Sequence, residues 1–255
     1  MLVSVLASGS EGNCTYVKMG DKNILIDLGM NMKYIVEKLG EINVSPNDID
    51  YVFITHTHSD HIGAMQVFLN KYKPMVFLSE KMMPELPFLE DYPSLDFRDK
   101  DIVLDDLVVE PFKTSHDAPG SRGYIFKDKE HSFVYVTDTG YINHKHHEKL
   151  SNHEVYVIES NHDVEMLMNG RYPVWLKKRV NSDEGHLSNH QAAFYLSKFI
   201  GPNTKQIVLA HLSKENNTPE IALASVKEEL KENGIDFDNF LIAKQRERTD
   251  CDELW

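Results

Sequence analysis

The pattern of apolar and polar positions along the chain predicts strands and helices in alternation. Short runs rich in β-branched and aromatic residues have the length of strands. The expected strands are Leu2–Ala7, Thr15–Val17, Ile24–Asp27, Tyr51–Ile54, Met75–Leu78, Leu107–Glu110, Tyr124–Phe126, Phe133–Val136, Val155–Ile158 and Gln206–Ala210. Longer segments with helical periodicity predict helices over Met32–Leu39, Ile62–Tyr72, Asn189–Phe199 and Pro219–Glu232.

The last two helices carry start signals. Thr218 is an expected N-cap before Pro219, and Ser188 is an expected N-cap for the helix before it. Strands come early as hairpins and helices are interleaved, which favours a layered α/β arrangement of two mixed sheets covered by helices. The proline-rich stretch Met83–Pro93 predicts a surface loop, and residues 1–255 are expected to form one domain.

Composition narrows the class of protein. With 41 % apolar residues the chain resembles an ordinary globular protein, but 40 acidic residues against 27 basic ones give a net charge of −13. That charge argues against a broad non-specific nucleic-acid surface and leaves open an enzyme that binds phosphates locally. Cys14 and Cys251 are far apart in sequence, which predicts two unpaired thiols. We expect a cytoplasmic location and no membrane partner, because signal-peptide and membrane-span patterns are missing.

Four potential metal ligands follow the strand Tyr51–Ile54. His56 and His58 are two residues apart on an extended segment, so they point to the same side. The chain then turns into a helix, which brings Asp60 and His61 to the same place from another direction. Imidazole nitrogens and carboxylate oxygens are common ligands of zinc, manganese and iron. The segment therefore predicts part of a site for two cations.

Three further residues of ligand type stand alone, and each follows an apolar strand. They are His116, Asp138 and His211. Functional side chains are common where a buried strand emerges. Taken singly, each would more often be a satisfied surface or core residue. Together with the first segment they indicate one metal centre.

The complete set resembles the HxHxDH segment and the later His, Asp and His of the metallo-β-lactamase superfamily. This resemblance implies a four-layer αβ/βα sandwich, with two mixed sheets flanked by helices. It implies one cation on His56, His58 and His116, a second on Asp60, His61 and His211, and Asp138 as the bridge between them. It also implies that Asp60 takes part in catalysis and that Asp27 supports a ligand from behind.

Hydrolysis follows from such a centre. Two cations about 3.5–4 Å apart lower the pKa of a shared water and neutralise charge on a carbonyl or phosphoryl oxygen. Five imidazoles and two carboxylates suit two ions of zinc, manganese or iron. The superfamily hydrolyses lactams, thioesters, lactones and phosphodiesters, so its fold does not identify the bond that is cut.

One locally basic segment helps to identify the bond that is cut. The stretch Met166–Asn181 contains no acidic residue, and its basic residues are Arg171, Lys177, Lys178 and Arg179. These side chains would attract phosphates, and Tyr172 and Trp175 could stack on bases. A solvated basic helix face is an equally good interpretation.

A second feature is the segment Gly185–Asn189, which opens a predicted helix. Backbone N–H groups at a helix start suit an anion, so Ser188 and Asn189 are candidate substrate contacts. His186 could protonate a leaving oxygen, with Glu159 as the carboxylate that orients it. The superfamily's nucleic-acid-processing members have similar features.

The opening SGSEGN loop and the TDTG, ESNHD and GHLSN segments together resemble the WalJ/YycJ family of bacterial metallo-hydrolases. This resemblance implies a metal-dependent DNA exonuclease that works from 5′ ends, with DNA favoured over RNA, a part in DNA repair and DNA-repair factors as partners. Ser10 and Asn13 could donate to a terminal phosphate, although a tight turn is an equal alternative. The segment between His61 and His116 is too short for the insertion of the β-CASP nucleases.

Two other functions remain open at this point. A small-molecule acyl hydrolase, such as a glyoxalase-like thioesterase or a lactonase, would use the same metal cluster and suits the acidic charge. A regulatory partner of a signalling system could retain the metals for structure alone. The sequence also leaves open the metal, the oligomeric state and the role of the tail, whose Leu254 and Trp255 could dock on the domain or on a partner.

Overall fold

The computed structural model describes residues 1–252, which form two seven-stranded sheets. The first sheet has the order β14 (Thr249–Asp250), β1 (Leu2–Ala7), β2 (Cys14–Met19), β3 (Lys22–Ile26), β4 (Tyr51–Phe53), β5 (Met75–Phe77), β6 (Leu95–Asp96). The second has the order β13 (Phe240–Ile242), β12 (Gln206–Ala210), β11 (Val155–Glu159), β10 (Ser132–Val136), β9 (Arg122–Lys127), β8 (Leu107–Lys113), β7 (Ile102–Leu104). Both sheets contain parallel and antiparallel pairs, so both are mixed.

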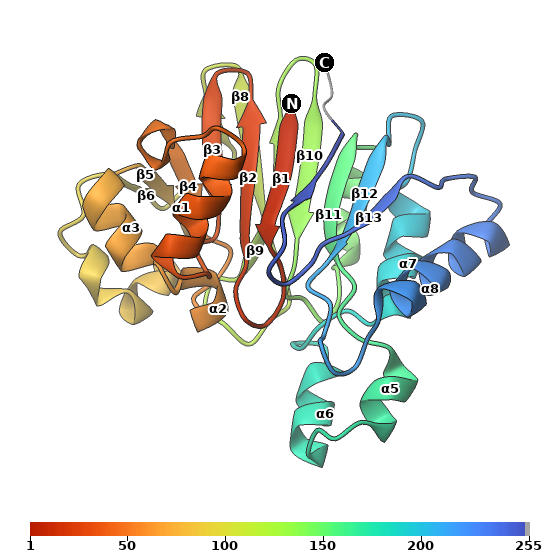
Figure 1. The fold of residues 1–255 in the computed structure, drawn as a ribbon. Helices are drawn as coiled ribbons and strands as arrows, with labels where there is room; N and C mark the ends of the chain where they lie inside the picture. The colour runs from red at the N-terminus through yellow and green to blue at the C-terminus, as the bar shows by residue number, and fades with distance from the viewer. Residues whose placement is uncertain (253–255) are drawn as a thin grey trace.

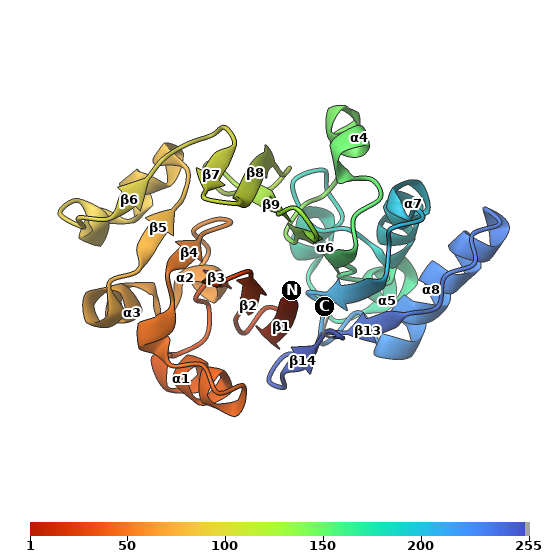
Figure 2. The same cartoon turned by 90° about the horizontal axis from the view of Figure 1, so that it is seen from above.

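Helices cover the outer faces of the two sheets (Figures 1 and 2). On the first sheet they are α1 (Met32–Glu41), α2 (Ser59–Ile62) and α3 (Met65–Tyr72), and on the second α4 (His147–Leu150), α7 (Asn189–Phe199) and α8 (Pro219–Glu232). The short helices α5 (Val164–Asn169) and α6 (Val174–Val180) project from one end of the sandwich (Figure 1). The predicted layered α/β sandwich is confirmed. Within residues 1–252, every helix is too short or too polar to cross a bilayer.

Strand alternation produces three apolar layers. In β12, Val208 and Ala210 face the core between the sheets, whereas Ile207 and Leu209 face the helices. The first sheet divides in the same way, and Leu25 of β3 packs toward its covering helices. Both faces of the central strands are therefore buried, which explains why they appear in the sequence as nearly continuous apolar runs.

Several predicted elements have the predicted bounds, namely β1, β12, α7 and α8. The caps are also confirmed. Ser188 accepts the backbone N–H of Gln191, and Thr218 accepts that of Ile221.

The prediction of one helix over Ile62–Tyr72 is wrong, because the chain divides into α2 and α3. In a continuous helix the Asp60 carbonyl would accept the N–H of Ala64. Here it accepts the N–H of Asn13 at 2.7 Å, and the Ala64 N–H donates to Leu28 at 2.8 Å. Bonds to two distant loops thus replace the helical bond.

The prediction of a surface loop over Met83–Pro93 is wrong in part. Two 3₁₀ turns, η2 (Glu80–Glu85) and η3 (Pro87–Leu89), occupy much of the stretch. Leu86 and Leu89 are fully buried in the layer between the first sheet and its helices. Apolar burial therefore folds this segment against the domain in spite of its prolines. Two further 3₁₀ turns are η1 (Pro46–Asp48) and η4 (His144–His146).

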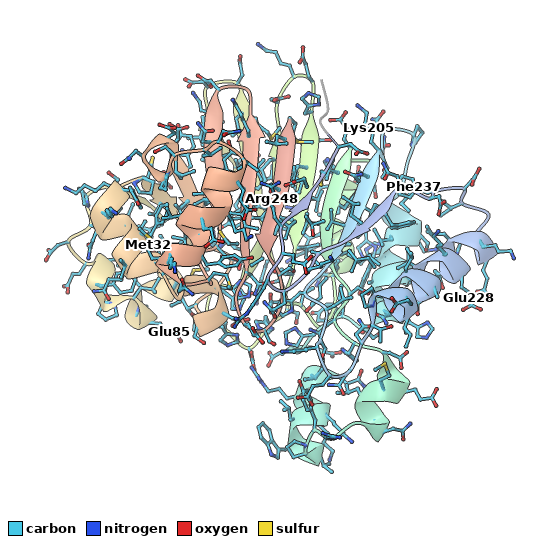
Figure 3. The ribbon with its side chains drawn as sticks, viewed as in Figure 1. Met32, Glu85, Lys205, Glu228, Phe237 and Arg248 are labelled. Carbon is cyan, nitrogen blue, oxygen red and sulfur yellow. The ribbon has the colours of Figure 1, made fainter. Side chains whose placement is uncertain are left out.

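Four strands were not predicted: β6, β7, β13 and β14. Each has only two or three residues and lies at or near a sheet edge, where periodicity is undetectable. β14 pairs with β1, and Arg248 (labelled in Figure 3) pairs with Asp250 at 2.9 Å. The tail therefore docks on the first sheet as far as its described residues reach, and Leu254 and Trp255 lie outside them.

Gly29 provides a test of the close packing beneath α2. A Cβ at this position would overlap the Asp60 carbonyl, so Gly29→Ala should lower the free energy of unfolding by about 1–3 kcal/mol. Gly40→Ala, in α1 with open space around it, should raise it by about 0.8–1.0 kcal/mol through helix propensity. Urea unfolding followed by circular dichroism measures both. Equal stability of the Gly29→Ala variant and the parent would contradict the packing.

Candidate metal centre

The site forms where strands of the two sheets end. Asp27 follows β3, Asp138 lies just past β10 and His211 follows β12. All three have a left-handed backbone, with φ of 60°, 54° and 55°. Such a conformation costs a non-glycine residue about 1–3 kcal/mol and is typical of functional sites. The sharp turn after each strand directs these side chains toward a common point.

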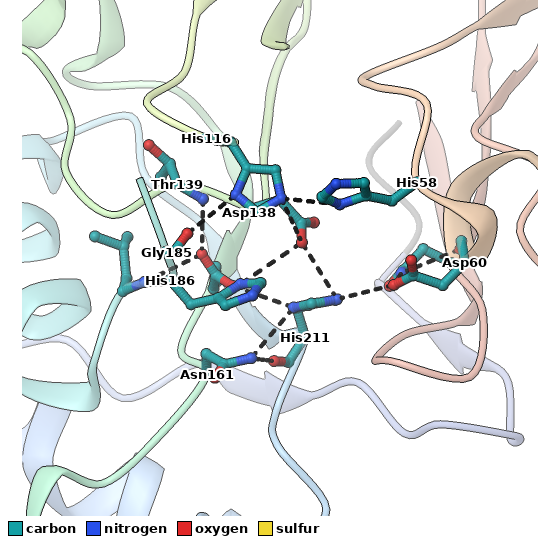
Figure 4. A network of polar contacts seen from close by, with 12 residues as sticks. His58, Asp60, His116, Asp138, Thr139, Asn161, Gly185, His186 and His211 are labelled. Carbon is teal, nitrogen blue, oxygen red and sulfur yellow. Dashed lines mark hydrogen bonds and ion pairs between the residues drawn. The ribbon is translucent and has the colours of Figure 1, made fainter. Parts of the chain in front are cut away.

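Two groups of ligand atoms converge there. Figure 4 shows five of these residues, namely His58, Asp60, His116, Asp138 and His211. Donor atoms of His56, His58 and His116 lie within 4.8 Å of one another, as do those of Asp60, His61 and His211. Asp138 lies between the groups. Its Oδ2 is 3.2 Å from Nε2 of His61, and its Oδ1 is 3.9 Å from Nε2 of His116 and 3.5 Å from Nε2 of His211. The structure thus brings together all seven residues that the sequence singled out as ligands.

Each of the five imidazoles has one ring nitrogen held by the protein. Asp27, which is fully buried, accepts from Nδ1 of His61 at 2.7 Å and from the Thr55 N–H at 2.8 Å. Nδ1 of His116 lies 3.1 Å from the Gly185 carbonyl. The remaining contacts are Thr55 Oγ1 to His56 Nδ1 at 3.1 Å, Asp117 Oδ1 to His58 Nε2 at 3.5 Å and Glu159 Oε1 to His211 Nδ1 at 3.1 Å.

The opposite ring nitrogens fit a metal. Nε2 of His56 and Nε2 of His211 are buried without a hydrogen-bond partner among the described residues. An unsatisfied buried polar atom costs about 1–3 kcal/mol, which a bound cation would relieve. Burial, aided by the nearby His61, holds the pKa of His56 well below its usual value and keeps this ring in the neutral form that binds metal. The residues present therefore suit divalent cations.

Glu159 and His186 form a pair beside the ligands. Oε1 of Glu159 lies 2.7 Å from Nδ1 of His186, and Oε2 accepts the N–H groups of Thr139 and Leu187 at 3.0 and 3.2 Å. Burial alone would raise the pKa of Glu159, but attraction and hydrogen bonds from His186 and His211 lower it to about 2. Glu159 is thus a carboxylate at neutral pH, and it fixes the orientation of the His186 ring.

A cavity of about 320 Å³ opens beside these groups. One wall contains Tyr172, Leu176 and Arg179, from α6 and the turn before it. The lining also includes Ser10, Asp60, Asp138, His186 and His211. Among the predicted substrate contacts, Ser10 and Arg179 thus reach the site.

Arg171 and Lys177 do not line this cavity. The ammonium of Lys177 donates to the Met168 carbonyl at 2.7 Å, which ties α6 to α5. Arg171 lies in the turn between α5 and α6 and Lys177 lies in α6, so neither predicted contact reaches the cavity lining.

Three predicted substrate contacts are engaged elsewhere. Ser188 caps α7, and Asn189 is fully buried, with its side chain bonded to Ser160 at 2.7 Å and to Asn217 at 2.9 Å. Asn13 is also fully buried, and its amide nitrogen lies 2.9 Å from Nε2 of His61. Because their polar atoms already have protein partners, we leave these three residues out of the substrate contacts and correct that prediction.

Two site residues were missed. Asp117 links the centre to α6, since its Oδ2 lies 2.6 Å from Nε of Arg179 while its other oxygen contacts His58. Asn161 donates to the His211 carbonyl at 2.9 Å. Adjacency to His116 was the available signal for Asp117, and Asn161 lies in the ESNHD segment.

Comparison with known proteins identifies the family. Residues 7–174 match the Metallo-beta-lactamase superfamily. The chain is 39 % identical to Exodeoxyribonuclease WalJ of Streptococcus pneumoniae, over 92 % of this chain and 91 % of that protein. The chain belongs to the WalJ/YycJ family of the metallo-β-lactamase superfamily. Its similarity to Exodeoxyribonuclease YycJ of Bacillus anthracis, a member of the same WalJ/YycJ family, is also 39 % identity, over 91 % of this chain and 90 % of that one.

A solved structure shows the same fold. The metallo-beta-lactamase fold protein YhfI from Bacillus subtilis superposes with a TM-score of 0.71, at 16 % identity, over 97 % of this chain and 98 % of that one. The WalJ/YycJ resemblance and the fold that it implied are therefore both confirmed. Membership of the superfamily also implies that the chain binds divalent metal ions.

The role of Asp27 behind His61 can be tested by metal affinity. Asp27→Asn should weaken metal binding about 10–100-fold, because the His61 ring loses its carboxylate partner. Glu154→Gln is a matched control, since Glu154 is a buried carboxylate bonded to His131 at 3.0 Å outside the centre. Competition with a chromophoric chelator measures both. Equal loss of affinity in the two variants would show a general effect of buried charge and would contradict the assignment.

Proposed function

We propose that this protein is a metal-dependent DNA exonuclease. The observation that carries the proposal is the place of Arg179 and Tyr172, which form a wall of the same cavity as Asp60, Asp138 and His186. A cation and an aromatic ring beside a metal centre suit a phosphate and its base. The WalJ and YycJ relatives, which are named exodeoxyribonucleases, support this choice over an acyl hydrolase.

We assign the ligands to two cations. His56, His58 and His116 would hold the first, and Asp60, His61 and His211 the second, with Asp138 shared between them. Zinc, manganese and iron all suit this donor set. When bound, two such ions supply a nucleophile at neutral pH and neutralise charge that develops on the phosphate.

His186 is the proposed general acid. Glu159 engages Nδ1 of its ring, so Nε2 remains for the cavity that His186 lines. With Nδ1 held by Glu159, the ring is oriented so that Nε2 can give a proton to the departing oxygen of the DNA strand. Asp60, which lines the same cavity, orients the reacting group from the opposite side.

The helix pair α5–α6 supports the substrate. Trp175 is 67 % exposed at the start of α6, where it can stack on a base. Arg171 and Lys177 add positive charge to the pair, and exposed Ser10 offers a hydroxyl in the lining of the cavity. In a chain with a net charge of −13, this pair concentrates attraction for phosphate at one end of the sandwich.

The polarity of digestion, the preference for DNA and the cellular role rest on the family likeness alone. We propose digestion from 5′ ends, DNA as the substrate in preference to RNA, and a part in DNA repair alongside repair factors. Residues 1–255 would act as one hydrolase domain, in agreement with the core that the two sheets share. A cytoplasmic location agrees with the free, buried thiols of Cys14 and Cys251.

The proposed activity can be tested directly. Purified protein with Mn²⁺ should shorten 5′-labelled duplex DNA and release small labelled products, and a chelator should abolish the reaction because the ligand groups then lose their ions. Gel electrophoresis resolves the products. DNA that stays intact with Zn²⁺, Mn²⁺ and Fe²⁺, together with rapid cleavage of a thioester or lactone, would replace the nuclease with the acyl hydrolase.

The general acid has its own test. His186→Ala should lower kcat on DNA about 10²–10⁴-fold while metal content is retained. His190→Ala is the matched control, because this exposed histidine lies in the first turn of α7, shortly after His186 in the sequence. Rates from a fluorescent oligonucleotide and metal content by atomic absorption are the measurements. A His186→Ala variant within threefold of the parent rate would remove His186 from the chemistry.

A further inference from the structure

A second cavity shares no lining residue with the cavity that Tyr172, Leu176 and Arg179 line. It has a volume of about 430 Å³, within the range of small-ligand pockets. The end of β8, the start of β9 and the η2 turn form its walls. His116 lines this cavity, and its Nε2 is 3.2 Å from Nδ1 of His58, which lines the first cavity (Figure 4). Each cavity is therefore lined by one member of a pair of neighbouring metal ligands.

The lining of this second cavity favours an anion. Lys81 and Lys113 belong to this lining, both are exposed, and neither forms an ion pair among residues 1–252. Arg122 is 7 % exposed and is already engaged by Asp99 at 2.5 Å, which is the one acidic residue in the lining. The two lysines thus remain as uncompensated positive charge.

Hydroxyl groups complete this lining. Thr114 and Ser121 are buried and bond to each other at 2.6 Å, and Ser79 is buried on the η2 side. Gly120, with φ of 70°, packs so closely on Ser79 that a Cβ would lie 2.6 Å from its hydroxyl. A left-handed glycine therefore allows the two walls to approach. Cations with hydroxyls at close range are the usual surroundings of a phosphate.

From this arrangement we infer that the Lys81–Lys113 cavity binds a backbone phosphate of the DNA strand next to the phosphodiester being cut. The inference rests on the proposed nuclease function and extends it. One nucleotide would occupy the first cavity, beside α6, and the scissile phosphate would lie at the metal ligands. The strand would then continue past His116. The acidic chain would then hold its substrate at two local basic positions, one in each cavity.

The double variant Lys81→Ala/Lys113→Ala tests this path in the metal-loaded full chain. The ratio of kcat/KM for a single-stranded oligonucleotide to that for bis(p-nitrophenyl) phosphate should fall about tenfold, because only the longer substrate reaches the cavity. The slope of log kcat/KM against log salt should also flatten by about 0.7, the value for one lost phosphate contact on a single strand. Lys81→Arg/Lys113→Arg should restore both values.

Lys18→Ala/Lys231→Ala is the matched control, since it removes the same charge from two exposed lysines in β2 and α8. Fluorescence anisotropy of a labelled oligonucleotide in EDTA gives a second readout without catalysis, and the same flattening is expected there. Equal ratios and slopes in the alanine variant, the control and the parent overturn the inference while DNA cleavage stands. A parent protein that leaves DNA intact overturns the proposed function, and the inference with it.

Discussion

The centre depends on hydrogen bonds to the ring nitrogens that face away from it. Asp27, Glu159 and the Gly185 carbonyl each fix one histidine from behind, so the opposite nitrogen is aimed at the common point. Without these partners, a buried imidazole could rotate toward any other acceptor. Because the partners come from the ends of β3 and β11 and from the loop before α7, both sheets must be in place before the ligands converge.

Backbone hydrogen bonds from distant segments fix the turn that carries Asp60 and His61. Their carbonyls accept the N–H groups of Asn13 and Leu28, both at 2.7 Å, instead of continuing the helix. Two loops of the first sheet are thus fastened to the ligand segment. The absence of a side chain at Gly29 permits this approach. Metal binding and the packing of the first sheet are therefore coupled through backbone contacts.

Charge is arranged unevenly around the centre. The chain is strongly acidic, yet the α6 wall and the Lys81–Lys113 cavity each place positive side chains in a cavity that a metal ligand also lines. Asp117 joins one flank to the centre, because one of its oxygens meets Arg179 and the other meets His58. An acidic surface with local basic positions disfavours broad binding to nucleic acid and concentrates attraction where the strand must lie.

The sequence by itself determined the ligand chemistry and most of the framework. The His56–His61 segment, the lone residues after strands and the caps Ser188 and Thr218 are local patterns. A local pattern can be recognised without knowing which distant residues it will contact. Only the tertiary structure decided the break between α2 and α3, the engagement of Asn13 and Asn189 by protein groups, and the role of Asp117. Each of these depends on which distant segment supplies a hydrogen-bond partner. The periodicity of apolar residues does not reveal which segment that is. The edge strands β6, β7, β13 and β14 were beyond prediction for a related reason, since two or three residues gain their structure only from a neighbouring strand.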